Sequence, residues 1–555
     1  MKPMLYDVVV VGSGISGLYA ALNARMEGLS VAIISKSTPL RSNSAVASGG
    51  INAVMKTTRH DLYRQHISDT MSSASQLGRF PVISNMVWGA TDIINELRSM
   101  GVVFDTEDDG SVSQRAFGGT TAKRTCYIAD RTGASITQTL LMQCRKEGVE
   151  IFSNHLMLDI TTFQEKLSGI TILRRRDSQV IAFACKSLVL AGGGYAGIYR
   201  GHSSNSQESS GDVLSAALRA GMRLVNTEFV QFHPTTLLKS GTLISEAARG
   251  EGAYIVDETG TRFTNELQTR DKLSRDIVHH QMQGHTVYLD FRHLGEELID
   301  KKLPSARKHA LHGAGIDILT ELLPITPSAH YTMGGIWSSN DTSSDIKNVF
   351  VCGECAYSGV HGANRLGGNS LLEAAYFGKV AGINAANAAK DGKYHPIDYA
   401  LVAKQSRNIE HILEGENRFN INTMRTNLGN SLYRNAGVFR DYDSLMNALD
   451  YVHYLMKVSS GLCCVNKERS DNVELMSIIE FKNALIVAEA MVMSSLARKE
   501  SRGVHYRNDY PQQDDKYFNA DTIIRRLTSS FLKISFEGYL SSDWSHRLRR
   551  FFHVL

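Results

Sequence analysis

The segment at residues 6–36, YDVVVVGSGISGLYAALNARMEGLSVAIISK, constrains the fold more than any other part of the chain. An apolar β-branched run is followed by a glycine turn, an alanine-rich stretch and a second apolar run, which predicts a βαβ unit. The turn carries Gly12, Gly14 and Gly17 in the spacing GxGxxG. Glycines at these positions allow a tight turn and the close approach of a pyrophosphate to the helix N-terminus. The segment therefore predicts a dinucleotide-binding site.

This motif does not by itself distinguish NAD from FAD. The position expected to carry an acid for the ribose is occupied by Ser35 and Lys36, and Lys36 suits either a 2′-phosphate or a solvated strand end. Two later segments, 186–194 and 348–354, again place a glycine turn after an apolar strand, and the second ends in Glu354. Three such units far apart favour one large flavin-binding domain with an insertion. Glu354 is then a candidate for the polar acceptor that the first unit lacks.

The rest of the chain supplies the other predicted domains. The insertion contains a hairpin signal at residues 257–263 and helical periodicity after Arg275, which indicates an α+β capping domain. Beyond residue 400 the apolar residues recur at three- and four-residue spacing, as in helices. The predicted fold is α/β, a Rossmann-like FAD-binding domain with an inserted α+β capping domain and a C-terminal helical domain. Its predicted parts are an FAD-binding domain at 1–236 and 343–399, a capping domain at 237–342, a helical domain at 400–520 and a C-terminal tail at 521–555.

Composition and charge restrict the possible partners and the compartment. The 555 residues include 60 basic and 56 acidic side chains, so no strong field favours nucleic acid. The first strand is expected from about Leu5, which leaves no room for an export signal, and no apolar run approaches the roughly 18 residues of a membrane helix. A cytoplasmic protein is expected, with attachment to the inner face of the cell membrane through partner subunits left open.

The seven cysteines are expected to be free thiols, because their number is odd and they are scattered. Cys352 and Cys355 form a CxxC, but no second pair stands at the spacing that would complete a four-thiolate site. We therefore predict no metal site, and electrons must come from outside the chain. An external iron–sulfur subunit is the expected partner, and a membrane anchor or another electron-donor subunit remains open.

Five longer motifs appear in order along the chain. They are QFHPT at 231–235, SEAARGEGA at 245–253, LSRDIV at 273–278, HYTMGGI at 330–336 and HGANRLGGNSLLEAAYFG at 361–378. With them the chain resembles the flavoprotein subunits of succinate dehydrogenase and fumarate reductase, with L-aspartate oxidase as a near relative. The resemblance extends to ARKESRGVHYRNDYP at 497–511. It implies an FAD-dependent oxidoreductase that interconverts fumarate and succinate by hydride transfer.

The resemblance also gives a meaning to RSNSAVASGGINA at 41–53, which corresponds to a family segment that contacts the flavin. Gly49 and Gly50 are expected to lie against the ring and the substrate, where a Cβ would collide. The family's flavin-linking histidine is replaced by Asn43, whose amide has no nucleophilic ring nitrogen. FAD is therefore expected to be noncovalent and fumarate reduction to be favoured, unless the subfamily tunes its flavin by other means.

The predicted cofactor contacts combine the glycine turns with this resemblance. Ser370 to Glu373 also reads as a capping box that begins a helix pointing at the flavin. The cofactor-binding set is Gly12, Gly14, Ser16, Gly17, Ser35, Lys36, Ser42, Asn43, Ser44, Gly49, Gly50, Ala191, Gly192, Gly193, Asp212, Glu354, Arg365, Ser370 and Leu371.

The substrate and catalytic residues follow from the resemblance, residue by residue. One carboxylate of a C4 dicarboxylate is expected at His233 and Ser245, and the other at His330 and Arg365, whose guanidinium can form two parallel bonds. Phe117 and Gly50 complete the predicted substrate pocket. Arg275 aligns with the proton donor, and Glu246 and Arg249, three residues apart on one helical face, with the relay that supplies it. Arg275 could instead be a salt-bridged link between domains.

Two other functions remain to be weighed. L-aspartate oxidase binds a substrate ammonium through a glutamate before two glycines, where this chain has Phe117, so a dicarboxylate without an amine is favoured. A flavin-binding protein without turnover is disfavoured by the full set of histidines and arginines. The last residues, SHRLRRFFHVL, combine basic and aromatic side chains that could touch a partner or lipid, and a frayed end is the favoured interpretation.

Overall fold

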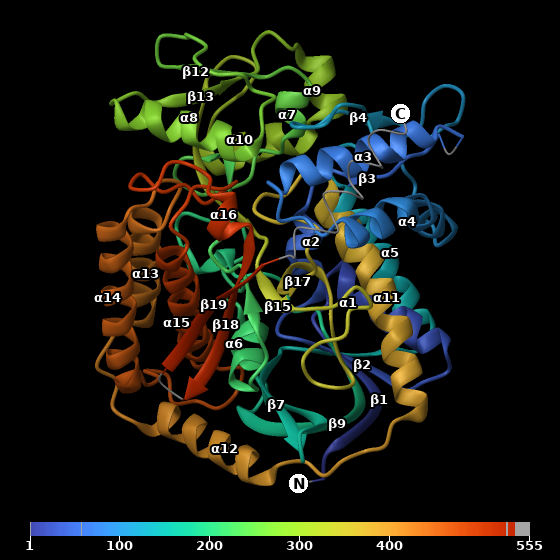
Figure 1. Ribbon diagram of the computed structural model, residues 1–555, viewed down its shortest axis with the longest axis vertical. Coiled ribbons are helices and arrows are strands. Elements are labelled where there is room, and N and C mark those ends of the chain that lie inside the picture. Colours follow the sequence, from blue (N-terminus) through green and yellow to red (C-terminus); the bar gives the residue numbers. More distant parts are fainter. Residues whose placement is uncertain (1, 57, 529–530, 539–555) are drawn as a thin grey trace.

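The structure is a computed structural model that describes residues 2–56, 58–528 and 531–538. Figure 1 shows a sheet-bearing part below, a cap above it, and a group of C-terminal helices along one side. No helix among the described residues is long and apolar enough to cross a membrane. The predicted end segment SHRLRRFFHVL lies outside the described residues.

The N-terminal βαβ unit forms as predicted. Strands β1 (Met4–Val11) and β2 (Val31–Ser35) are parallel and are joined by helix α1 (Ile15–Met26). Side chains of β1 alternate between the two faces of the sheet, so that Val8 and Val9 lie in different hydrophobic cores. A strand buried on both faces reads as a continuous apolar run, which is why the sequence VVVV predicts it.

The large sheet joins segments that are far apart in the sequence. Its order is β6-β2-β1-β9-β8-β7, and β16 pairs with β9, so the sheet is completed only after the capping insertion. The sheet is therefore built from segments that lie on both sides of the cap in the sequence. The further strands are β6 (Glu150–Ser153), β7 (His155–Phe163), β8 (Lys166–Arg174), β9 (Gln179–Leu190) and β16 (Val349–Val351).

Helices cover both faces of this sheet. One core contains side chains of α1, α4 (Phe80–Ser99), α5 (Thr132–Lys146) and α11 (Asn369–Asp391). The opposite core contains α6 (Asp212–Arg219) and reaches the C-terminal helices. Further elements complete this part: α2 (Asn43–Val46), β3 (Ile51–Asn52), α3 (His60–Ser73), β4 (Gln114–Arg115), β5 (Thr125–Cys126), β10 (Leu224–Val225), β15 (Gly335–Trp337) and β17 (Ala356–Tyr357).

The cap is a separate sheet with its own hydrophobic core. Its strand order is β11-β14-β13-β12, and strand β11 begins at Val230, before the predicted boundary at 237. The predicted turn at 257–263 is present, because Val256 bridges Arg262. The elements are β11 (Val230–Leu237), α7 (Ala247–Gly250), β12 (Tyr254–Asp257), α8 (Arg270–Met282), β13 (Val287–Asp290), α9 (Glu296–Lys302), α10 (Pro304–Ala314) and β14 (Leu323–Thr332).

The C-terminal helices form as predicted, and each begins at a capping side chain. The caps are Asp398, Asn420, Asp441, Asn472 and Asp514, whose oxygens accept backbone N–H groups of the first turn. The helices are α12 (Tyr399–Glu414), α13 (Ile421–Asn435), α14 (Tyr442–Val458), α15 (Val473–Ala497) and the short α16 (Asp515–Phe518).

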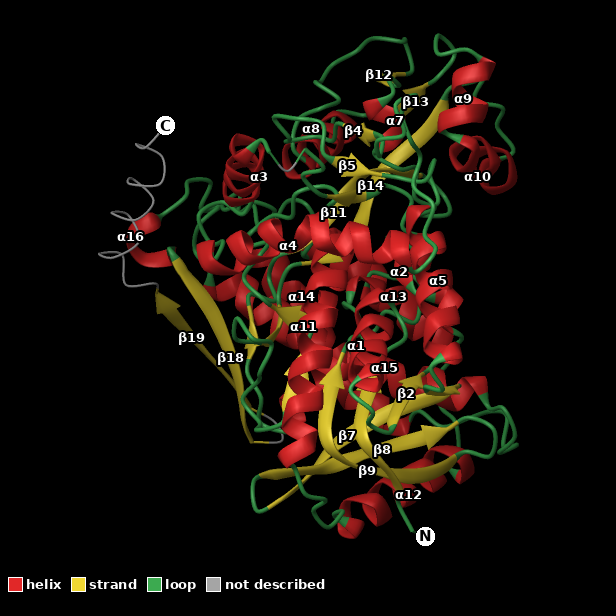
Figure 2. Cartoon of the chain, turned by 90° about the vertical axis from the view of Figure 1, so that its right-hand side faces the viewer, coloured by secondary structure: helices red, strands yellow, loops and turns green. Residues whose placement is uncertain are grey.

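The predicted tail from residue 521 is wrong for its first half. Strands β18 (Ala520–Thr528) and β19 (Phe531–Gly538) form a hairpin, which lies at the edge of the molecule in Figure 2. Strand β18 also pairs with β10. Arg498, fully buried, donates to the carbonyl of Ala520 and to the hydroxyl of Thr522. The hairpin is therefore part of the folded body.

This placement predicts unequal effects of two substitutions on β18. Ile524→Ala should lower the free energy of unfolding by about 2–5 kcal/mol, because Ile524 is fully buried and the truncation leaves a cavity. Leu527→Ala on the same strand is the control, since Leu527 is 56% exposed and should change stability by less than about 0.5 kcal/mol. Urea denaturation measures both, and equal small effects would contradict the assignment of β18 to the core.

Candidate active site

The glycine turn after β1 forms a close contact between backbone segments. Gly12 has φ of +112°, and a Cβ there would collide with the carbonyl of Ala191. A Cβ on Gly17 would collide with the carbonyl of Gly12, so the third glycine lets α1 pack on the turn. Gly14 instead faces the hydroxyl of Ser44, 3.0 Å from an added Cβ. The three glycines thus serve the tight turn, the access to the helix N-terminus and the helix–strand packing.

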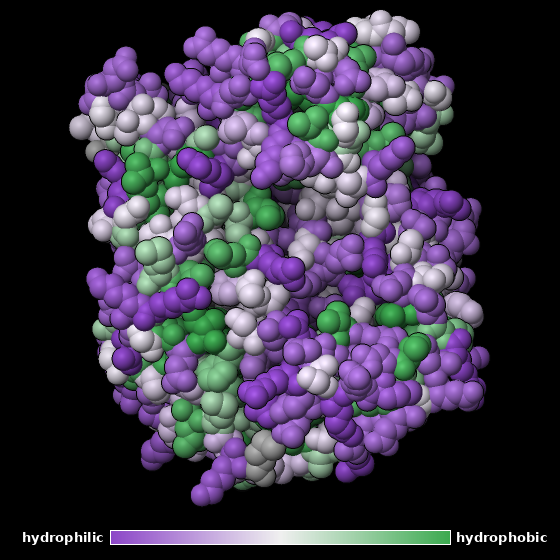
Figure 3. Space-filling model, turned by 180° about the vertical axis from the view of Figure 1, so that it is seen from behind, coloured by the Kyte–Doolittle hydropathy of each residue, from purple (hydrophilic) through white to green (hydrophobic). Residues whose placement is uncertain are grey.

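A cavity of about 530 Å³ begins at this turn and extends to the cap. Seen from behind, the surface is hollowed near its centre, below the cap (Figure 3). Most of the predicted cofactor residues line the cavity: Gly12, Gly14, Ser16, Ser35, Lys36, Ser42, Asn43, Ser44, Ala191, Gly192, Gly193, Asp212, Glu354, Ser370 and Leu371. Its volume, the glycine turn and the helix N-terminus at Ile15 fit a dinucleotide cofactor.

Gly17, Gly49, Gly50 and Arg365 are the predicted cofactor residues that do not line this cavity. A Cβ on Gly49 would meet the ring of Phe117 at 3.0 Å, and Gly50, at φ of +130°, would place one 2.6 Å from the carbonyl of Cys126. Packing within the chain therefore already requires both glycines.

Lys36 and Asp212 bind each other. The Lys36 ammonium lies 2.5 Å from Asp212 and 3.0 Å from Glu480 of α15. Burial lowers the pKa of Lys36, but the two carboxylates together outweigh burial, so the pKa is raised. Of the two interpretations of Lys36, the solvated strand end is excluded. The ammonium instead links β2 to α6 and to the C-terminal helices.

Asn43 is held by its amide on both sides. Its Nδ2 donates to the hydroxyl of Ser209 at 2.9 Å, and its Oδ1 accepts from the backbone N–H of Ser206 at 3.0 Å. Ser42 caps the same short helix by accepting from the N–H of Ala45. These contacts place Asn43 in the cavity wall as a bridge between α2 and the loop before α6.

Glu354 lies in the wall beside strand β14. Its Oε1 accepts from the backbone N–H of Thr332 at 3.0 Å and from the Thr332 hydroxyl at 3.2 Å. Burial disfavours the carboxylate and raises the pKa of Glu354 to about 7, against the effect of these hydrogen bonds. Glu354 is thus a buried acid near its titration point within the predicted cofactor site.

A buried ion-pair cluster lies where the cap meets the FAD-binding domain. Arg270, the first residue of α8, donates from Nε (2.9 Å) and Nη2 (2.5 Å) to Oε2 of Glu246. Oε1 of Glu246 accepts from the N–H of Gly118 and lies 3.8 Å from Nη2 of Arg249. Burial opposes ionisation of Glu246, but Arg270 and Arg249 outweigh it and lower its pKa to about 2. The predicted Glu246–Arg249 neighbourhood is therefore present.

Gln231 joins this cluster to the FAD-binding domain. Its Oε1 accepts from Nη1 of Arg270 at 3.2 Å and from Nη2 of Arg365 at 3.2 Å. Arg365 also donates to the hydroxyl of Ser370 at 2.7 Å, which lines the cavity. Burial and the charge of Arg270 lower the pKa of Arg365 to about 9, so Arg365 remains charged at neutral pH.

His233 and His330 face each other, with ring centroids 5.0 Å apart. Nδ1 of His330 shares a hydrogen bond with the hydroxyl of Ser204 at 2.8 Å, and His330 lines the cavity. Burial first, and then the neighbouring charge of Arg270, hold the pKa of both histidines well below the usual value, so both rings are neutral. Ser245 is 9% exposed and its hydroxyl accepts the N–H of Ala247.

Arg275, the predicted proton donor, is not brought into the cluster of Glu246 and Arg249 that was expected to supply it. Its guanidinium donates to Asp271 at 2.9 Å and to the carbonyl of Gly503 at 3.1 Å, and it lies over the ring of Tyr506. The alternative interpretation, a link between domains, is the arrangement observed. Sequence reasoning missed Arg270, although the dipeptide Arg-Asp occurs at both positions in TRDKLSRD.

The predicted capping box after the GANRLGG loop is also not formed. Helix α11 begins at Asn369 after Gly368, which has φ of +81°, and it has no side-chain cap. Ser370 instead accepts from Arg365, and Glu373 accepts from Tyr331 and contacts His361. The helix begins where it was predicted, but its first turn serves the site.

Comparisons with known proteins agree on one family. A family model described as an FAD binding domain matches residues 7–371, and one described as the fumarate reductase flavoprotein C-terminus matches residues 425–542. A succinate dehydrogenase flavoprotein subunit of Rickettsia bellii is 34% identical, over 93% of this chain and 92% of its own length. An 8-methylmenaquinol:fumarate reductase flavoprotein subunit of Wolinella succinogenes is 33% identical over 98% and 92%. The chain belongs to the family of succinate dehydrogenase and fumarate reductase flavoprotein subunits.

Solved structures of this family have the same fold. A quinol–fumarate reductase with menaquinol molecules is similar with a TM-score of 0.93 and 31% identity, over 98% of this chain and 99% of that one. A Mycobacterium smegmatis succinate dehydrogenase in complex with UQ1 gives a TM-score of 0.88 and 31% identity, over 99% and 97%. The likeness spans the FAD-binding domain, the cap and the C-terminal helices together.

The raised pKa of Glu354 predicts a pH effect on the flavin-free protein. Between about pH 4.5 and 7 the folded chain keeps a proton on Glu354 that the unfolded chain releases. The contribution of this proton to the free energy of unfolding is therefore complete below about pH 4.5 and is lost as the pH rises through about 7. Glu354→Gln removes this titration and can still accept from Thr332. Relative to wild type, the free energy of unfolding of the variant should increase by up to about 3 kcal/mol between pH 5 and pH 8. Urea denaturation across this range measures the difference, and a constant difference would contradict the raised pKa.

Proposed function

We propose that this chain is the catalytic flavoprotein subunit of a fumarate reductase, which interconverts fumarate and succinate with FAD. The observation that carries the proposal is the charge of the buried cluster. Arg249, Arg270 and Arg365 supply three positive charges against the one negative charge of Glu246. Because both histidines are neutral, a surplus of two positive charges remains. A C4 dicarboxylate of charge −2 would neutralise it.

The geometry favours a dicarboxylate over an amino acid. Both oxygens of Glu246 are already bound, to Arg270 and to the N–H of Gly118, so Glu246 offers no free charge to a substrate ammonium. Phe117 is buried beside Glu246 and Gly49 and presents an apolar ring. L-aspartate would bring an ammonium group for which the site offers no partner, and its net negative charge is smaller than that of a dicarboxylate without an amine.

Each task of the reaction has a candidate side chain. His233 and His330, held neutral, would donate N–H groups to carboxylate oxygens, and Arg365 would bind the second carboxylate in a fixed orientation. FAD, held by the residues that line the cavity, would supply the hydride chemistry at one substrate carbon. Arg270 would give a proton to the neighbouring carbon. Glu246, which lies between Arg270 and Arg249, would then pass a new proton to Arg270.

The cofactor is proposed to be noncovalent, and the direction to favour fumarate reduction. By the resemblance described above, Asn43 stands where a flavin-linking histidine is expected, and its amide is engaged with Ser206 and Ser209. A flavin without that bond has a lower potential and donates electrons more readily. Electrons would reach it through an iron–sulfur partner subunit, with attachment to a membrane through further subunits.

Two arginines of α8 provide the sharpest test of this function. Arg270→Gln should lower fumarate reduction and succinate oxidation by about 10²- to 10⁴-fold, since the proposed proton donor is lost. Arg275→Gln is the matched control on the same helix. Its part-buried ion pair with Asp271 and its cation–π contact with Tyr506 are each worth about 1 kcal/mol, so its rate should stay within roughly tenfold of wild type. Stopped-flow reoxidation of the reduced protein by fumarate measures both. Equal losses, or reduction of the oxidised protein by aspartate but not by succinate, would refute the proposal.

The mode of flavin attachment can be tested separately. Acid precipitation of the purified protein should release the yellow colour into the supernatant, because Asn43 cannot form the histidyl bond. Asn43→Ala should release it equally, which shows that the asparagine is not an attachment point. Colour retained in the wild-type pellet would contradict noncovalent binding while leaving the activity proposal untouched.

A further inference from the structure

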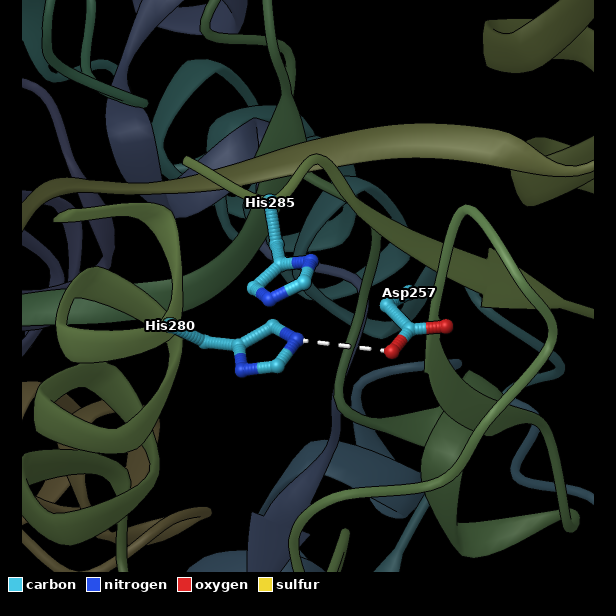
Figure 4. Close-up of side chains that lie close together, drawn as sticks. All are labelled: Asp257, His280 and His285. Atoms are coloured by element: carbon cyan, nitrogen blue, oxygen red, sulfur yellow. Dashed lines mark ion pairs between the residues drawn. The ribbon is translucent and has the colours of Figure 1, made fainter. Parts of the chain in front are cut away.

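Three side chains of the cap meet at a place that the proposed reaction does not use. Asp257 ends strand β12, His280 lies in the last turn of α8, and His285 follows that helix (Figure 4). Their candidate ligand atoms all lie within 4.8 Å of one another. The cluster is on the cap, whereas the cavity is lined by other residues.

The carboxylate of Asp257 is held so that one oxygen faces His280. Its Oδ1 accepts three hydrogen bonds, from the N–H and hydroxyl of Thr259 and from the N–H of Thr261. These bonds, those of Thr259 first, lower the pKa of Asp257 to about 2, so the group is a carboxylate at neutral pH. Oδ2 points toward Nε2 of His280.

The separation between Oδ2 of Asp257 and Nε2 of His280 is 3.6 Å. This is too long for a hydrogen bond, for which about 2.7–3.2 Å is usual. Nε2 of His280 is buried and has no hydrogen-bond partner among the described residues. Two ligands at about 2.0–2.1 Å from one tetrahedral ion stand about 3.4 Å apart, so the observed separation suits a bridging ion.

His285 is arranged like a metal-ligating histidine with a supporting carboxylate. Its Nδ1 donates to Oε1 of Glu258 at 2.9 Å, which leaves Nε2 as the free lone pair. The ring is stacked on His280, with centroids 4.2 Å apart. Because the side chain of His285 is 38% exposed, it has room to turn out of the stack and direct Nε2 toward the other two groups.

We propose that Asp257, His280 and His285 bind one divalent transition-metal ion of the zinc class, with water as the fourth ligand. Two imidazoles and one carboxylate suit such an ion better than Mg²⁺ or Ca²⁺, which prefer oxygen ligands. The bound ion would join the last turn of α8, the helix that begins with Arg270, to strand β12.

Metal binding to the purified flavoprotein tests this site without any measurement of turnover. After chelator treatment and dialysis, calorimetric titration with Zn²⁺ should show binding near one equivalent, and Co²⁺ should give the visible absorption of a four-coordinate ion. Mg²⁺ should not bind there. Affinity for Zn²⁺ should decrease on acidification, because the histidines must be neutral to bind metal.

Variants identify the ligands. His285→Ala should weaken Zn²⁺ binding by more than about 100-fold, and Glu258→Gln by about 10- to 100-fold through loss of the supporting carboxylate. The control is His279→Ala, which removes an exposed histidine of the same helix next to His280 and should leave binding unchanged. No Zn²⁺ binding by wild type, unchanged binding by His285→Ala, or an equal loss in His279→Ala would each overturn the proposal.

Discussion

The ion pair between Arg270 and Glu246 is the interaction on which the active site depends. It keeps Glu246 ionised in a buried position and fixes the guanidinium of Arg270 beside Gln231. Gln231 then holds Arg365 of the other domain by the same oxygen. A buried carboxylate without Arg270 would be costly, and so would a buried guanidinium without Glu246. Position and charge of the site therefore depend on this pair.

The cluster is not arranged for stability alone. Two of the three buried guanidinium groups, those of Arg249 and Arg270, share the carboxylate of Glu246, and Arg249 leaves its Nε and Nη2 without a hydrogen-bond partner among the described residues. Uncompensated positive charge in a dry site destabilises the fold, and a dianionic substrate would relieve it. The buried guanidinium of Arg498, by comparison, has all three of its nitrogens bonded, to Glu228, to Glu500 and to the carbonyl of Ala520. Arg249 thus retains donor nitrogens that a ligand could engage, which Arg498 does not.

Helix α8 connects several of the features that matter for function. Its first residue, Arg270, belongs to the cluster, and one turn later Arg275 binds Asp271 and the carbonyl of Gly503. Asp271 also accepts from Asn364 of the loop that carries Arg365. The last turn of the helix holds His280 beside Asp257. One rigid element thus sets the position of the cap against the FAD-binding domain and of Arg270 against its partners.

The sequence alone determined the parts that rest on local patterns. The first βαβ unit follows from its apolar strand and glycine spacing, and the C-terminal helices follow from apolar residues at three- and four-residue spacing. The residues around the cavity were predicted partly from the glycine turns and partly from the resemblance to a known family. Only the tertiary structure decided between Arg270 and Arg275, because both stand in an Arg-Asp dipeptide and the choice depends on which one meets Glu246 across the fold. It likewise decided that residues 520–528 pair with β10, since strand pairing over about 300 residues of chain leaves no local signal.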